Sequence, residues 1–185
     1  MMMKLQEKYK KEVVPAMMKK FNYKSPMAVP KIEKVVINTG FGRQVAQKAK
    51  QEREKIYQDI LNDLALVCGQ RPVLTLARKS VSGFKIRKGM PIGAKVTLRR
   101  KKMYDFLDRL IHIALPRTRD FKGIDPKSID KQGNLTIGVK EHIVFPEVAS
   151  ESVGRIFGFE ITIVTNAKTR EEAEELFRLL GFPLK

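Results

Sequence analysis

Few residues of this chain have the chemistry that catalysis or metal binding requires. The two histidines, His112 and His142, are far apart, and neither belongs to a His-x-x-x-His spacing that would place two imidazoles on one helix face. The single cysteine, Cys68, excludes an intramolecular disulfide and a cysteine-based zinc site. It stands in an apolar stretch, where a thiol is typically a small buried side chain. The sequence therefore predicts no catalytic residue, no metal site and no cofactor.

A glycine pair, Gly40-Phe41-Gly42, follows a β-branched segment and would suit the start of a nucleotide-binding turn. The third glycine of that fingerprint would fall at position 45, which is occupied by Val45, and no Lys-Ser/Thr pair of a P-loop follows. We therefore interpret the glycine pair as a turn or a bulge.

Four neutral polar residues have the right chemistry to contact RNA. Asn, Gln and Thr side chains can hydrogen-bond base edges or ribose hydroxyls. Neighbouring strands could bring Asn38, Gln70, Thr75 and Thr97 together on one face of a sheet. From the residues alone, an ordinary role as turn and sheet polars explains them equally well.

The distribution of charge points to a polyanionic partner. The chain has 37 Lys and Arg against 20 Asp and Glu, a formal net charge of +17. The segment from Leu64 to Tyr104 contains no carboxylate, whereas a merely solvated face normally interleaves both signs. Its cations are Arg71, Arg78, Lys79, Lys85, Arg87, Lys88, Lys95, Arg99, Arg100, Lys101 and Lys102. The pattern favours nucleic-acid contact over a membrane surface, because the segment shows no basic amphipathic helix.

Composition narrows the class of protein further. With 185 residues, 43% of them hydrophobic, the chain can bury the core of one domain, and we expect residues 1–185 to form it. No apolar run approaches the ~18 residues of a membrane span. The charged start lacks the apolar stretch of a secretory signal, so we expect a cytoplasmic protein. Trp is absent and aromatics make up 8%, so base stacking is not expected to dominate binding.

Helix and strand patterns alternate in the first half of the chain. Residues 4–21 predict a basic amphipathic helix, interrupted or restarted at Pro15, and residues 32–38 predict a strand. Helical spacing over residues 51–68 precedes Gly69, a suitable C-cap. Residues 72–77 predict another short strand.

The glycine-containing segment 78–94 predicts a long, basic, flexible loop, centred on residues 79–92. A strand over 95–100 and a helix ended by Pro116 should follow, and then a second loop over 117–132.

The last third of the chain predicts strands at 134–141 and 159–165 and a final helix. That helix begins at a capping box, Thr169-x-x-Glu172, and ends at Gly181. The order strand, helix, strand, strand, helix, strand between residues 32 and 141 is the split βαβ arrangement of ferredoxin-like and RNA-recognition folds. The predicted class is α+β, with helices on one sheet face and the other face free for RNA.

Long stretches of the chain are similar to a known ribosomal-protein family. The segments that carry the resemblance are Leu64–Ser80, Val81–Arg99, Val29–Asn38, Pro116–Gly123 and Gly138–Pro146. They resemble the universal family of large-subunit ribosomal proteins that carries 5S rRNA, in its bacterial form. The resemblance covers essentially the whole chain. It departs in residues 43–63, which are longer than usual and should extend a surface helix, and in a triple-Met start that leaves the initiator open.

The resemblance implies an antiparallel sheet with helices on one side and no catalysis. It implies binding of 5S rRNA and large-subunit rRNA through Lys31, Lys34, Asn38, Gln70, Thr75, Arg78, Lys95, Thr97 and Arg99. It implies contact with P-site tRNA through Lys79, Ser80, Val81, Ser82, Gly83, Phe84 and Lys85. It implies that an intersubunit bridge to a small-subunit head protein includes Arg117, Arg119 and Lys122. Further implied partners are the other 5S rRNA-binding ribosomal proteins, and no membrane is implied.

Two other function classes remain open at this point. A free-standing RNA-binding regulator or RNA chaperone could use the same fold, and it should wash off large ribosomal subunits at high salt. An RNA-processing enzyme is disfavoured because the sequence offers no titratable cluster for the RNA face.

Overall fold

The computed structural model describes residues 4–46, 48–119, 121–148 and 156–185. The chain divides into two compact units. Unit 1 comprises Met1–Val35, Leu98–Ile137 and Ile161–Lys185, and unit 2 comprises Val36–Thr97 and Gly138–Glu160. A single domain over residues 1–185 stays a prediction.

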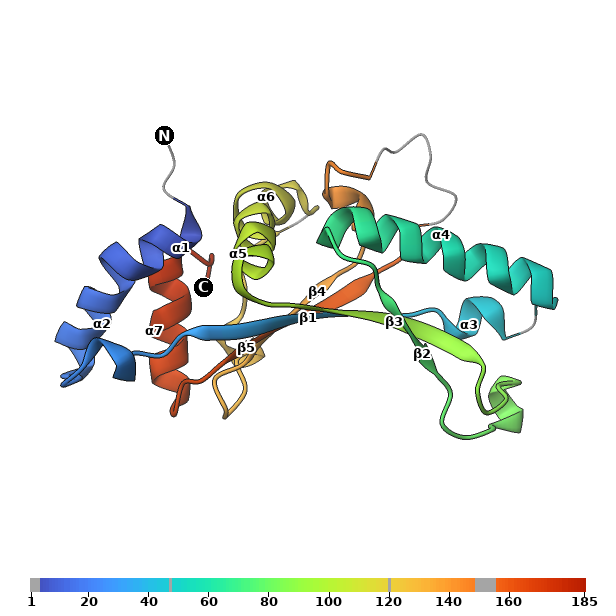
Figure 1. The fold of residues 1–185 in the computed structure, drawn as a ribbon, viewed down its shortest axis with the longest axis horizontal. Helices are drawn as coiled ribbons and strands as arrows, with labels where there is room; N and C mark the ends of the chain where they lie inside the picture. The colour runs from blue at the N-terminus through green and yellow to red at the C-terminus, as the bar shows by residue number, and fades with distance from the viewer. Residues whose placement is uncertain (1–3, 47, 120, 149–155) are drawn as a thin grey trace. The chain divides into compact units, whose positions relative to one another are not determined.

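A five-stranded antiparallel sheet has the strand order β2-β3-β1-β5-β4 (Figure 1). Its strands are β1 (Ile32–Gly40), β2 (Val73–Leu76), β3 (Pro91–Leu98), β4 (Leu135–Val139) and β5 (Phe159–Thr165). Strand β3 lies between β1 and β2, as the split βαβ order predicts. The split βαβ order would also place β4 beside β1, and this part of the prediction was wrong. Strand β5, from the C-terminal part of the chain, lies beside β1, and β4 lies at the edge of the sheet. The predicted α+β class with an antiparallel sheet is confirmed.

The N-terminal helix of unit 1 contains a proline without breaking. It consists of α1 (Leu5–Lys8), a π-helical turn over Tyr9–Val13 and α2 (Val14–Phe21), which contains Pro15. A proline ring would clash with the carbonyl four residues earlier in α geometry. In the wider π turn, Val14 N–H instead donates to Tyr9 O, five residues back. The predicted interruption at Pro15 is therefore a local change of helix type.

The second helix of unit 1 uses the same arrangement at Pro116. It consists of α5 (Arg100–Arg109), a π turn over Leu110–Ala114 and α6 (Leu115–Arg117). The Leu115 N–H donates to Leu110 O, so the helix passes Pro116 and ends at Arg117. The prediction that Pro116 ends this helix was wrong, because the preceding π turn accommodates the ring.

The C-terminal helix α7 (Arg170–Leu180) begins as predicted. Thr169 Oγ1 accepts a hydrogen bond from Glu172 N–H at 3.3 Å, and Glu172 Oε2 accepts one from Lys168 N–H at 2.9 Å. Gly181 ends the helix with φ 99°, in the left-handed region that favours glycine. Three side chains of α5 and α7, Phe106, Phe177 and Leu176, are fully buried in the core.

Unit 2 contains the short helix α3 (Gly42–Val45) and the long helix α4 (Lys50–Cys68). Ile56, Ile60, Leu64 and Val67 form the buried stripe of α4, at the predicted helical spacing. Gly69 caps the helix at φ 63°, and Cys68 is buried as expected. Residues 43–63 therefore supply most of α3 and most of α4, with exposed cations and carboxylates on the outer side of α4.

The segment before β3 is more regular than predicted. Across its base, Ala77 N–H donates to Met90 O at 2.8 Å, and nearer the tip Val81 N–H donates to Ile86 O at 2.9 Å. The tip itself is a 3₁₀ turn, η3 (Ser82–Phe84). Assignment of residues 91–94 to a loop was wrong, because β3 begins at Pro91, where the first residue of a strand tolerates proline. The flexibility of the tip stays a prediction.

Three further 3₁₀ turns complete the described elements: η2 (Pro26–Ala28), η5 (Pro126–Ser128) and η6 (His142–Val144). Within the described ranges, no helix is both long and apolar enough to cross a membrane.

The histidine of η6 is a buried titratable group in unit 2. The His142 ring stacks on Phe157 with centroids 4.0 Å apart, and its Nδ1 accepts a hydrogen bond from Phe157 N–H at 3.4 Å. Its Nε2 lies 3.3 Å from Asp63 Oδ2, within the distance of an ion pair. Burial lowers the pKa of His142 by desolvating the imidazolium, and the Asp63 carboxylate opposes that shift. This environment explains His142 as a structural residue.

The free energy of unfolding should decrease as the pH falls below about 6.5, the ordinary histidine pKa. In that range the unfolded chain takes up a proton that folded His142 resists. Burial raises the pKa of Asp63, which makes the free energy of unfolding increase as the pH falls and so opposes the effect of His142. The contribution of His142 is therefore measured by comparing wild type with a His142 variant. Urea unfolding at several pH values should show a flatter profile for His142→Gln than for wild type. His112→Gln, at an exposed site, is the matched control, and an equal flattening in both variants would contradict this assignment.

Candidate nucleic-acid interface

The pairing of strands in unit 2 places the predicted polar residues in adjacent rows. Strands β2 and β3 are antiparallel, with Val73 opposite Lys95 and Thr75 opposite Gly93. Between β1 and β3, Phe41 N–H donates to Ile92 O at 2.9 Å. An antiparallel ladder continued from this bond places Gly40 opposite Gly93 and Asn38 opposite Lys95.

The alternation of burial shows which side chains share a face. Ile37 and Thr39 are buried, whereas Asn38 between them is exposed. On β3, Lys95 and Thr97 alternate with the buried Val96. Asn38, Lys95 and Thr97 therefore lie on the sheet face opposite to the buried side chains.

Contacts with residues of β3 place Thr75 on the same face and Gln70 at its border. A Cβ built on Gly93 would lie 2.7 Å from Thr75 Oγ1, so the Thr75 hydroxyl is on the side of Lys95 and Thr97. Gln70, between α4 and β2, donates from Nε2 to Thr97 O at 3.3 Å. We call Asn38, Thr75, Lys95 and Thr97, with Gln70 at their border, the polar face. The four neutral residues singled out in the sequence are thus brought together within unit 2.

Gly93 keeps the centre of the polar face flat. A Cβ at this position would lie 2.6 Å from Thr39 O, a backbone atom of the neighbouring strand. Only glycine fits between β1 and β2 at this point.

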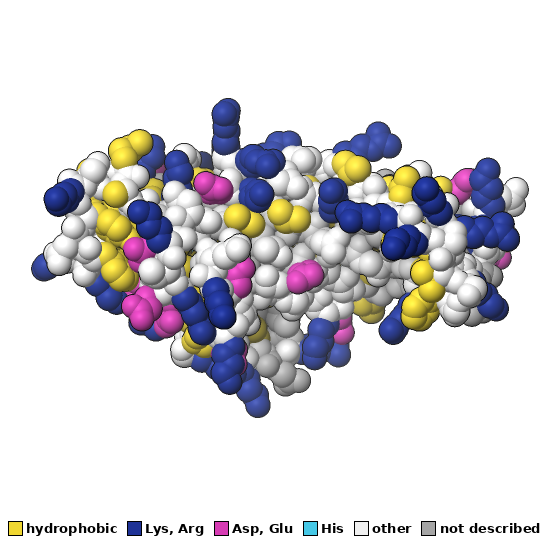
Figure 2. All heavy atoms as spheres, turned by 90° about the horizontal axis from the view of Figure 1, so that it is seen from below, with side chains coloured by type: hydrophobic (Ala, Val, Ile, Leu, Met, Phe, Trp, Pro, Cys, Tyr) yellow, Lys and Arg dark blue, Asp and Glu magenta, His cyan; other side chains and the backbone are white. Residues whose placement is uncertain are grey.

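Cations surround the polar face in unit 2. Arg71, Arg78 and Lys95 are exposed, and so are Lys79 and Lys85 on the segment that leads to η3. Figure 2 shows Lys and Arg side chains close together over the part of unit 2 that contains β2 and β3. Such a surface attracts the phosphates of a nucleic acid.

Other predicted rRNA-binding residues belong to unit 1. Lys31 is exposed, and its backbone N–H donates to Asn166 Oδ1 at 2.7 Å. Lys34 is half-buried on β1, and Arg99 is exposed immediately before α5.

The predicted bridge residues also belong to unit 1. Arg117 ends α6, and Arg119 and Lys122 follow it, all three with exposed side chains. Thr118 Oγ1 donates to Ala114 O at 3.0 Å, which anchors the start of this segment on the helix.

All seven residues of the predicted tRNA-contacting loop are exposed. Their tip is held by hydrogen bonds from Phe84 N–H to Val81 O at 3.3 Å and from Lys85 N–H to Ser82 O at 2.9 Å. The Phe84 side chain is 68% exposed, which is unusual for a large apolar ring.

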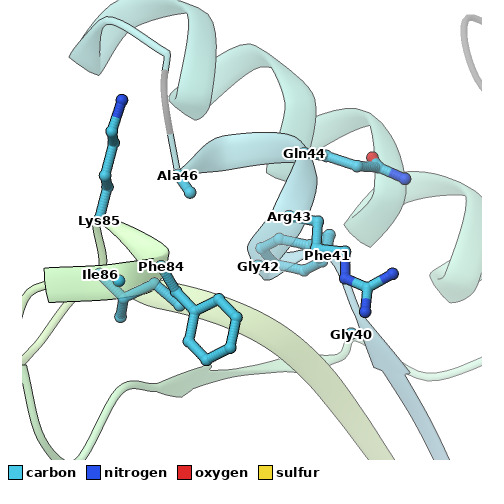
Figure 3. Close-up of a pocket in the computed structure, with 10 residues that line it drawn as sticks. Gly40, Phe41, Gly42, Arg43, Gln44, Ala46, Phe84, Lys85 and Ile86 are labelled. Atoms are coloured by element: carbon cyan, nitrogen blue, oxygen red, sulfur yellow. The ribbon is translucent and has the colours of Figure 1, made fainter. Parts of the chain in front are cut away.

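A cavity of about 740 Å³ lies between α3 and η3, and sequence reasoning missed it. Its lining includes Phe41, Arg43, Phe84 and Lys85 (Figure 3). The signal was the Gly40-Phe41-Gly42 segment, which we interpreted only as a turn or a bulge. Because the other wall comes from residues about forty positions later, no local pattern contains this cavity.

The described residues offer no alternative chemistry based on metals. No group of three or more His, Cys, Asp or Glu side chains in the described ranges could hold a metal ion. The arrangement is suited to hydrogen bonding and phosphate neutralisation.

Comparisons with known proteins cover the chain almost completely. Residues 25–87 match the family model described as Ribosomal protein L5, and residues 91–184 match the ribosomal L5P family C-terminus. The chain is 56% identical over 182 residues to the large ribosomal subunit protein uL5 of Caldanaerobacter subterraneus subsp. tengcongensis, covering 98% of each chain. It is 54% identical over 179 residues to the protein of the same name from Halothermothrix orenii, covering 97% of each. The corresponding protein of Clostridium acetobutylicum is 52% identical over 183 residues.

Proposed function

The chain belongs to the ribosomal protein L5 family, a structural and non-enzymatic component of the large ribosomal subunit, and from this premise we propose that it binds 5S rRNA through the polar face. The observation that carries the proposal is the gathering of Asn38, Thr75 and Thr97 on one exposed face of unit 2, with Gln70 hydrogen-bonded at its border. The family membership supplies the ribosome and its rRNA as the setting.

The chemistry of the polar face suits RNA. Its amide and hydroxyl groups can donate to and accept from base edges and ribose 2′-hydroxyls. Lys95 lies within the same face and can neutralise a phosphate, as can the nearby Arg78. Specific polar contacts surrounded by cations are the arrangement that positions and identifies an RNA.

Further contacts complete the proposal. The loop Lys79–Lys85 would contact P-site tRNA, and Arg117, Arg119 and Lys122 would contribute to a bridge with a small-subunit head protein. Lys31, Lys34 and Arg99 would grip rRNA phosphates. In a cytoplasmic ribosome, the protein would also contact large-subunit rRNA and the other 5S rRNA-binding proteins. Nearly full-length similarity to large-subunit proteins favours this role over a free-standing regulator or RNA chaperone.

Asn38→Ala and Gln70→Ala should each weaken 5S rRNA binding by about 1–3 kcal/mol, or about 5- to 150-fold in Kd, on the scale of base-edge contacts. Neither substitution removes a charge, so the dependence of log Kd on log salt concentration should keep its slope. Filter binding at several salt concentrations measures both quantities.

Gln132→Ala is the matched control, because this exposed polar residue lies in unit 1 outside the proposed contacts. Wild-type affinity in both Asn38→Ala and Gln70→Ala, with circular dichroism showing intact folds, would refute the assignment of the polar face.

A further inference from the structure

We propose that the cavity between α3 and η3 receives the base of one unstacked RNA nucleotide, stacked on the ring of Phe84. This inference rests on the proposed RNA-binding function and adds a site to it. Phe84 and Lys85 belong to the loop that we propose to contact P-site tRNA, whereas no residue of α3 was among the predicted contacts.

The position of Phe84 is the first argument. Its ring points from the η3 tip toward the Phe41–Arg43 turn across the cavity (Figure 3). Phe41 is 1% exposed and belongs to the core, whereas Phe84 is 68% exposed. The hydrogen bonds at Val81 and Ser82 hold the tip that carries this ring. An apolar ring presented to solvent by a hydrogen-bonded turn is available for stacking on a planar ligand.

The charges around the cavity favour an anionic ligand. The cavity is lined by the cations Arg43 and Lys85, and none of its lining residues is Asp or Glu. An adjoining cavity of about 560 Å³ shares Lys85 and adds Arg53 and Arg87, again without a carboxylate in its lining. A nucleotide supplies both complementary parts, a flat apolar base for the ring and phosphates for the cations.

The backbone around the cavity allows close approach. A Cβ built on Gly40 or Gly83 would meet no atom within 4 Å, so both glycines border open space. Their bare backbone N–H and C=O groups leave room for a sugar-phosphate chain beside the base.

The geometry favours one nucleotide that has left the stack over a paired helix. A single exposed aromatic ring offers one stacking surface, and RNA-binding proteins use such rings for splayed-out bases of loops and bulges. This agrees with the absence of Trp and the modest aromatic content, because stacking here is a local contact within mainly polar and ionic binding.

The chain contains no Trp, so Phe84→Trp creates a single fluorescent reporter in the cavity. Three titrations, with 5S rRNA, large-subunit rRNA and tRNA, identify the source of the nucleotide. Stacking should quench the fluorescence in a saturable manner with one of these RNAs. The matched control is Leu66→Trp, at an exposed apolar position of α4, which should not be quenched in parallel.

Affinity provides the second measurement. Phe84→Ala should weaken binding of the quenching RNA by about 5- to 100-fold without changing the salt slope, and Phe84→Trp should retain it. If 5S rRNA binds with wild-type affinity to Phe84→Ala, and no RNA quenches Phe84→Trp selectively, the cavity proposal is overturned while the polar-face proposal stands. If none of the three RNAs binds the wild-type protein, both proposals fail.

Discussion

Replacing Lys34, Arg78, Lys95 and Arg99 together with glutamine should weaken 5S rRNA binding by about 100- to 1,000-fold at physiological salt. Each lost phosphate contact reduces counterion release, so the slope of log Kd against log salt concentration should become shallower by about 3. Glutamine keeps most of the side-chain length and polarity, which limits the change to charge. Filter binding between low and high salt measures the affinity and the slope together.

A second quadruple variant separates position from total charge. Lys127, Lys131, Lys140 and Lys168 are exposed, and their replacement with glutamine lowers the formal net charge from +17 to +13, as the first variant does. We expect it to keep most of the affinity. Equal losses in the two variants would show that binding depends on overall charge and not on the proposed contacts.

Gly93→Val should lower the free energy of unfolding by about 1–3 kcal/mol and also impair 5S rRNA binding. The new Cβ would lie 2.6 Å from Thr39 O and 2.7 Å from Thr75 Oγ1. The Thr75 side chain can rotate away, but the Thr39 carbonyl can yield only if β1 and β3 move apart. That movement would disturb the two adjacent rows of the polar face, one with Asn38 and the other with Thr75. Urea unfolding and filter binding measure the two effects.

Gly138→Val is the matched control for this substitution. Gly138 is an exposed strand glycine of unit 2, and a Cβ built on it meets no atom within 4 Å. Its replacement should leave the stability within about 0.5 kcal/mol of wild type. If Gly93→Val were as stable as Gly138→Val, the close contact at the centre of the polar face would be disproved.

Local patterns predicted the types of most elements. Helical spacing located α4 and its Gly69 cap, and the β-branched segment over residues 32–38 located β1. Boundaries failed where proline was the signal. Pro116 lies within a helix and Pro91 begins a strand, because a π turn in one case and a strand terminus in the other removes the steric conflict.

The sequence by itself determined the chemistry that points to RNA: an acid-free basic segment and four neutral polar residues. Those properties depend on which residues are present and on periods of two and 3.6, which are local. Only the tertiary structure decided that β5 lies beside β1, that Gly93 must remain bare, and that Phe84 faces Arg43 across a cavity. Each of these depends on contacts between residues far apart in the chain, and such contacts leave no periodic trace in the sequence. The +17 charge indicated a polyanion, and the packed strands showed where its polar contacts can be made.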